Sequence, residues 1–145
     1  MFKFGGICWG DKSLSLGIPK SNFYFIENNF SDIILEIRNG ANGLQSEAGT
    51  IRKTIVFRDF KKMTCIEILD DSRREIELYW YDWYEQNQQL IMKFHAHYHP
   101  DGTSKEITVY DPFHIQTDTY RGPNENFREL YQILEFIRLR QLTLE

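Results

Sequence analysis

The chain has 145 residues, of which 41% are apolar and 26% charged, and its net charge is −4. This length fits one domain spanning residues 1–145, with a core large enough to fold without disulfides or metal ions. The negative charge excludes a general cationic coat for nucleic acid, but it leaves room for a small local RNA site.

The N-terminal stretch MFKFGGICWG has a short apolar start that Gly5 and Gly6 interrupt, so we expect no signal peptide. No window approaches the ~20 apolar residues that a membrane helix needs, and we expect no membrane association. Cys8 and Cys65 show neither C-x-x-C nor zinc-type spacing. We therefore expect two reduced, buried thiols in a cytoplasmic protein, with one long-range disulfide as the alternative.

In chain order, the first twenty residues read as loop with at most a short strand. Alternating apolar residues then predict strands, separated by Gly/Asn-rich or polar connections at 39–49, 70–74 and 85–89. The predicted strands cover 22–27, 32–38, 50–60, 63–69, 75–84, 90–99 and 106–116. In the second of these, Ile33, Leu35 and Ile37 are expected on one face.

The C-terminal part changes to helical spacing between Asn124 and Leu142. Asn126 and Glu129 form an N-x-x-E capping pattern at its start. Strands joined by short turns form a meander, and the helix must bury its apolar stripe. The predicted fold class is α+β, an antiparallel β-meander of about six to eight strands with the C-terminal helix packed on one face.

The segment YWYDWY at 79–84 places Tyr79, Tyr81 and Trp83 on one face of its strand, and Trp80, Asp82 and Tyr84 on the other. Aromatic residues on both faces suggest burial under the helix and against a partner chain, so a homodimer is one candidate assembly. The alternative is a stacking surface for nucleic-acid bases.

Three of the four histidines occupy alternate positions in MKFHAHYHP, at His95, His97 and His99. They share one face of the predicted strand with Lys93, each about 6.6 Å from the next. His95 and His99 are then about 13 Å apart, so one metal ion would take two of these histidines and a ligand from elsewhere. His114 is the obvious third group.

The segment PDGTSK at 100–105 has the composition of a hairpin turn. A turn centred on 101–104 pairs His97 with Thr108 and His95 with Tyr110. The even-numbered residues of the second strand, His114 among them, then join the histidine face. Pro112 is expected to mark an edge strand or a bulge, and a bulge of one residue would turn His114 away.

Three interpretations of this face remain open: an ordinary solvated surface, a metal site, and a catalytic or RNA-contacting surface. A ribonuclease without metal needs a base, an acid and a cation for the phosphate. His97, His99 and His114 are candidates for the first two roles, with His95 beside them. Lys93, Lys105 or Arg121 would supply the cation. On this interpretation no cofactor and no metal are expected.

The order of motifs after Glu75 resembles the TumE family of toxin–antitoxin proteins. An aromatic strand is followed by LIMKF, by a histidine cluster ending in His99-Pro100, by Pro112-Phe113-His114, and by a helix containing LYQILEFI. The resemblance covers about the last seventy residues, and His97, His99 and His114 match the family's histidine positions. It implies a compact α+β protein, an antitoxin partner, and a toxic action with RNA as the plausible substrate.

Two functional hypotheses follow, and they leave open whether the chain is an enzyme. The first is a toxin-like protein that cleaves RNA with its histidines. The alternative, favoured by the acidic composition and the two-faced aromatic strand, is a non-enzymatic binding module of the immunity, antitoxin or adaptor type.

Overall fold

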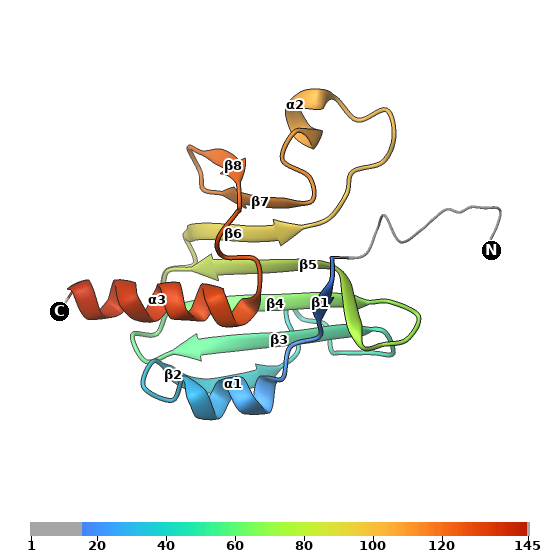
Figure 1. Ribbon diagram of the computed structural model, residues 1–145. Helices are drawn as coiled ribbons and strands as arrows, with labels where there is room; N and C mark the ends of the chain where they lie inside the picture. Colours follow the sequence, from blue (N-terminus) through green and yellow to red (C-terminus); the bar gives the residue numbers. More distant parts are fainter. Residues whose placement is uncertain (1–15, 145) are drawn as a thin grey trace.

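A computed structural model of the chain describes residues 16–144. Its centre is an antiparallel sheet in which each strand lies beside the next one in the sequence (Figure 1). In this order the strands are β2 (Ile34–Asn39), β3 (Thr50–Phe57), β4 (Lys62–Leu69), β5 (Glu75–Tyr84), β6 (Leu90–Ala96), β7 (Phe113–Gln116) and β8 (Arg121–Pro123). A short strand, β1 (Ile18–Pro19), pairs with the beginning of β5. The predicted meander is confirmed.

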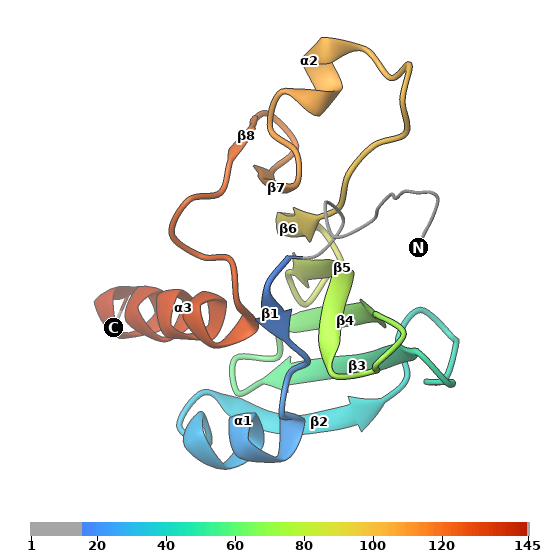
Figure 2. The same ribbon diagram turned by 45° about the vertical axis from the view of Figure 1, so that its right-hand side comes forward.

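Helices α1 (Phe23–Asn29) and α3 (Leu130–Leu144) lie on the same face of the sheet, as Figure 2 shows. A one-turn helix, α2 (Lys105–Thr108), lies in the long connection between β6 and β7, away from the other two. The α+β class with a C-terminal helix on the sheet is therefore confirmed.

The core lies between α3 and the sheet because both present apolar residues at the appropriate period. On β5, Tyr79, Tyr81 and Trp83 are buried, as predicted from alternation. The buried stripe of α3 consists of Leu130, Ile133, Leu134 and Ile137. Since strand side chains alternate, Trp80 and Asp82 point to the face that α3 leaves uncovered.

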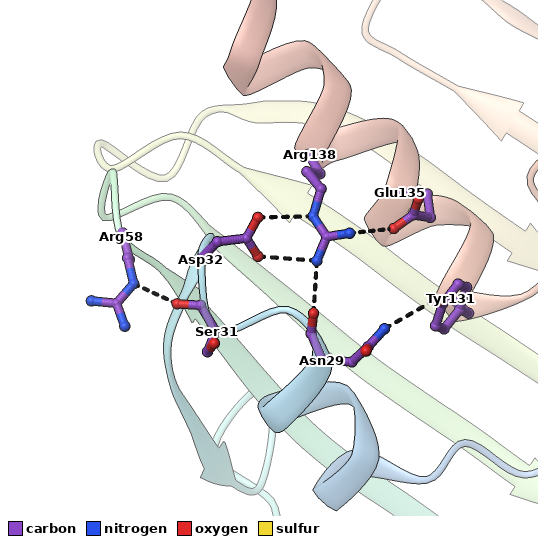
Figure 3. A network of polar contacts seen from close by, with 7 residues as sticks. All are labelled: Asn29, Ser31, Asp32, Arg58, Tyr131, Glu135 and Arg138. Carbon is purple, nitrogen blue, oxygen red and sulfur yellow. Dashed lines mark hydrogen bonds and ion pairs between the residues drawn. The ribbon is translucent and has the colours of Figure 1, made fainter.

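A polar network joins the end of α1 and the turn that follows it to α3 (Figure 3). The guanidinium of Arg138 contacts both carboxylate oxygens of Asp32 at 3.0 Å and donates to the Asn29 carbonyl at 2.7 Å. Glu135 accepts from the same guanidinium at 2.7 Å. These contacts of Arg138 hold the turn after α1 against α3.

The predicted strand at 22–27 is wrong, because this segment forms α1. The side chain of Asn22 accepts a hydrogen bond from the backbone N–H of Phe25 at 3.0 Å, which is a helix N-cap. Ile26 and Phe30, four residues apart, are both buried. Phe25 is 49% exposed, so the alternation of aromatic residues in this segment does not mark a buried face.

The prediction that Ile33, Leu35 and Ile37 share one face is also wrong. The pairing of β2 with β3 shifts register between Ile34 and Glu36. Ile33 and Ile34 are therefore both buried, whereas Leu35 is 46% exposed.

The tight hairpin over 100–105 and the strand over 106–116 are wrong in detail. Strand β6 ends at Ala96, and the chain forms α2 before only Phe113–Gln116 returns to the sheet. Strand β7 pairs with β8, so it is not the edge that Pro112 suggested, and its pairing with β6 shows no register shift. The peptide bond between Asp111 and Pro112 is cis.

Helix α3 begins at Leu130, later than the predicted start at Asn124, and Asn126 is not its cap. The side chain of Asn124 instead accepts from the Phe127 N–H in a preceding turn. Gln132 reaches back to accept from the N–H groups of Arg128 and Glu129. The polar side chains around the predicted start therefore serve a turn before the helix.

Cys65 is a free, fully buried thiol, as predicted, and burial raises its pKa well above the usual value. Cys8 lies outside the described residues, as does most of the N-terminal segment predicted to be loop.

Candidate active site

Four histidines lie close together where β6 ends beside β7. We call these residues the histidine cluster: His95, His97, His99 and His114. His95 and His114 are direct partners across the two strands. The N–H of His97 donates to the Pro112 carbonyl at 2.9 Å, which continues the ladder one step beyond β6. The sheet register therefore brings His114 to the face of His95 and His97.

The four imidazole rings are close enough together to contact one bound substrate. Ring centroids are 5.2 Å apart for His95 and His114, and 5.5 Å apart for His97 and His114. His99 lies beside His97 at 4.6 Å. One ring nitrogen from each of His95, His97 and His114 lies within 4.8 Å of the others, so these three could hold a metal ion.

Two carboxylates orient the outer histidines. Nε2 of His95 lies 2.7 Å from Oδ1 of Asp82, which reaches it from β5. Nδ1 of His99 lies 2.7 Å from Oδ1 of Asp111, whose second oxygen accepts from the backbone N–H of His99 at 2.9 Å. Each carboxylate fixes one ring nitrogen and leaves the other available for chemistry.

The surroundings of the two central histidines, His97 and His114, favour the neutral imidazole. Burial, followed by repulsion from His95 and Arg121, lowers the pKa of His114 to about 3. Burial and the neighbouring His99 and His95 also lower the pKa of His97. His114 is only 2% exposed, and its Nδ1 has no hydrogen-bond partner among the described residues.

Arg121 is the best placed of the three cations proposed from the sequence. It pairs with Gln116, two residues after His114, so it shares the histidine face, and its positive charge lowers the pKa of both His97 and His114. Lys93 is on the same face opposite Asp82. Lys105 is exposed on α2, and no contact places it at the cluster.

Comparison with known families decides the class of protein. The family model of the toxin TumE matches residues 23–141. The chain belongs to the TumE toxin family. The match includes all four histidines and extends well beyond the C-terminal half in which the sequence motifs first indicated it. A toxin of this family implies a cognate antitoxin partner.

No curated protein and no solved structure gave a significant match to this TumE-family chain. Among the described residues, no helix has the length and apolar character needed to cross a membrane.

The position of His114 on the histidine face agrees with the sequence prediction although the predicted pairing was wrong. His95 pairs with His114 rather than with Tyr110. This shift is four residues, an even number, so the same residues keep the same face.

Trp80 and Asp82 lie beside the histidine cluster, and the sequence had offered their segment as a possible stacking surface without linking it to the histidines. The ring of Trp80 lies 5.9 Å from His97 and 6.5 Å from His95, and it pairs with His95 across β5 and β6. The strands on either side of segment 85–89 pair with a register shift between Trp83 and Tyr84, and this shift places Trp80 opposite His95.

Proposed function

We propose that this TumE-family chain is a cytoplasmic toxin that cleaves RNA at the histidine cluster. One observation carries the proposal: four imidazoles converge on one half-buried face, two of them oriented by Asp82 and Asp111. An ordinary solvated face does not bury a histidine as deeply as His114 or supply a carboxylate to each outer ring.

The reaction that suits this group is attack of an RNA 2′-hydroxyl on the adjacent phosphate. A bond forms between O2′ and phosphorus, and the bond from phosphorus to O5′ breaks. The 2′-hydroxyl loses its proton at the cluster, and O5′ gains a proton as it leaves. The products are a 2′,3′-cyclic phosphate and a 5′-hydroxyl end. Imidazoles serve such steps as proton carriers or as ligands of an activating metal ion.

Arg121 and Trp80 supply the remaining requirements. The half-buried guanidinium of Arg121 provides positive charge for the phosphate. Because the whole chain has a net charge of −4, this positive charge must be concentrated at the site. Trp80, beside His97, offers a ring on which a base of single-stranded RNA can stack. These contacts favour a single-stranded substrate, whose bases are free to stack.

The test uses a single-stranded RNA oligonucleotide and the DNA oligonucleotide of the same sequence. We expect the purified chain to cut the RNA, with the cyclic phosphate and 5′-hydroxyl ends named above, and to leave the DNA intact because it lacks the 2′-hydroxyl. His97→Ala should abolish cutting.

Tyr24→Ala is the matched control, because Tyr24 is 79% exposed on α1, on the opposite face of the sheet, and its loss should change nothing. Cleavage of the DNA, or RNA cleavage by a correctly folded His97→Ala variant at the wild-type rate, would refute the proposal.

A further inference from the structure

We propose that His95, His97 and His114 form a binding site for one divalent transition-metal ion of the zinc class. Metal binding by these residues does not depend on the proposed function. A role of the bound ion in RNA cleavage rests on the proposed function. The sequence predicts no metal for a ribonuclease site and leaves open a metal site of two strand histidines with His114, and the pairing of β6 with β7 brings three histidine nitrogens together.

The three ligands come from two adjacent strands, so they lie closer together than three histidines along a single strand would. His95 and His114 face each other across β6 and β7, and His97 follows at the end of β6. Their nearest nitrogens lie within 4.8 Å of one another. Nitrogens bound at about 2.1 Å to a tetrahedral zinc lie roughly 3.4 Å apart, so small side-chain rotations would complete the site.

The hydrogen bonding around His95 and His114 leaves a ring nitrogen on each histidine available to bind a metal ion. Asp82 occupies Nε2 of His95, which leaves Nδ1 for an ion, and a carboxylate behind a histidine is the usual outer partner of a metal ligand. Nδ1 of His114 is buried without a hydrogen-bond partner among the described residues. A buried nitrogen of this kind requires a partner, and an ion would provide one.

His99 does not belong to the ligand set. Asp111 holds its Nδ1 at 2.7 Å and its backbone N–H at 2.9 Å, on the segment after β6 has ended. Among residues 16–144 the ligand group consists of three histidines, which leaves one coordination position open, as in catalytic rather than structural zinc sites. The open position would accept water or a phosphate oxygen of the RNA.

The ligand chemistry selects the class of ion. Three imidazole nitrogens suit Zn²⁺, Co²⁺, Ni²⁺ and Cu²⁺, whereas Mg²⁺ and Ca²⁺ require oxygen ligands. We therefore expect Mg²⁺ neither to bind at this site nor to displace the ion.

The experiment uses the full-length chain, prepared without a histidine tag and stripped with a chelator. It is titrated with Zn²⁺ by calorimetry and with Co²⁺ by visible absorption, which reports tetrahedral coordination. We expect one ion per chain and the absorption bands of a tetrahedral Co²⁺ complex. Asp82→Asn should weaken binding about 10- to 100-fold, as loss of an outer carboxylate partner does.

His114→Ala should abolish binding, and His99→Ala is the matched control that should retain it. Because His114 is buried, circular dichroism must show that its variant is folded, and Asp82→Asn provides an independent test if it is not. A folded wild-type chain that takes up no Zn²⁺ or Co²⁺ overturns the inference, as does binding that His99→Ala removes and His114→Ala leaves unchanged.

The two proposals fail in different ways. A chain that binds one Zn²⁺ at these residues but cuts no RNA would refute the proposed function and support the metal site. A chelator-treated chain shown to be free of metal that cuts RNA at full rate would refute the ion's part in cleavage and support the proposed function.

Discussion

Glu67 provides a test of the core that is separate from the histidine cluster. Its carboxyl is completely buried and accepts hydrogen bonds from the N–H and hydroxyl of Ser21 and from the hydroxyl of Tyr81. Burial raises the pKa of Glu67, and the hydrogen bonds only partly oppose this effect. The folded protein therefore binds a proton at Glu67 more tightly than the unfolded chain does.

The sign of the pH effect follows from this linkage. The stabilisation due to Glu67 is fully present below its unfolded pKa near 4.5 and is lost as pH rises through the raised folded value. A difference of one between the folded and unfolded pKa corresponds to about 1.4 kcal/mol. Glu67→Gln keeps an acceptor for Tyr81 and cannot ionise, so its free energy of unfolding relative to wild type should increase as pH rises from 4.5 towards neutral.

The assay is urea unfolding followed by tryptophan fluorescence at several pH values between 4.5 and 8. The quantity of interest is the difference in unfolding free energy between Glu67→Gln and wild type, which cancels the titration of other groups. It should grow with pH and then level off. Glu27→Gln, at an exposed position on α1, should show no such trend. A Glu67→Gln difference that is constant with pH, or falls as pH rises, would refute the reasoning.

Three further predictions concern single side chains. Trp80→Ala should weaken binding of single-stranded RNA by about 1–3 kcal/mol in a fluorescence-anisotropy titration, with Trp80→Phe between it and wild type, and equal affinities would exclude stacking. Ile137→Ala should lower the free energy of unfolding by about 2–5 kcal/mol because Ile137 is fully buried, whereas Leu139→Ala, at a position 61% exposed, should stay within about 0.5 kcal/mol of wild type. Arg138→Ala should cost no more than about 1–2 kcal/mol in the same assay despite its many contacts, because Asp32 is largely exposed, and a larger loss would mean that the network of Figure 3 is central to stability.

Elements with an unambiguous period were predictable from the sequence. Alternation places Tyr79, Tyr81 and Trp83 on one face of the segment from Glu75 to Tyr84, and the structure forms β5 over the same residues with all three buried. The apolar stripe of α3 was equally clear. By contrast, Phe23 and Phe25 fit a strand as well as a short helix, and the structure shows a helix that Asn22 caps through the N–H of Phe25.

The site was partly predictable because strand alternation fixes faces more firmly than it fixes partners. His114 reached the correct face despite a pairing error of four residues, since an even shift preserves the face. The hydrogen bond between the side chains of His95 and Asp82 could not be predicted from spacing along one strand, because it depends on how β5 and β6 align. The helix at Lys105–Thr108 was not predicted, because the turn-forming residues Pro100 to Ser104 before it indicated a hairpin.

Growth after induced expression tests the central claim most directly, namely that this TumE-family chain is toxic through its histidine cluster. Cells expressing the wild-type chain should stop growing, and co-expression of the cognate antitoxin should restore growth. Cells expressing His97→Ala at the same level of folded protein should grow normally, whereas Tyr24→Ala should remain toxic. Equal arrest by the wild type and a folded His97→Ala variant, or normal growth with the wild type, would contradict the account.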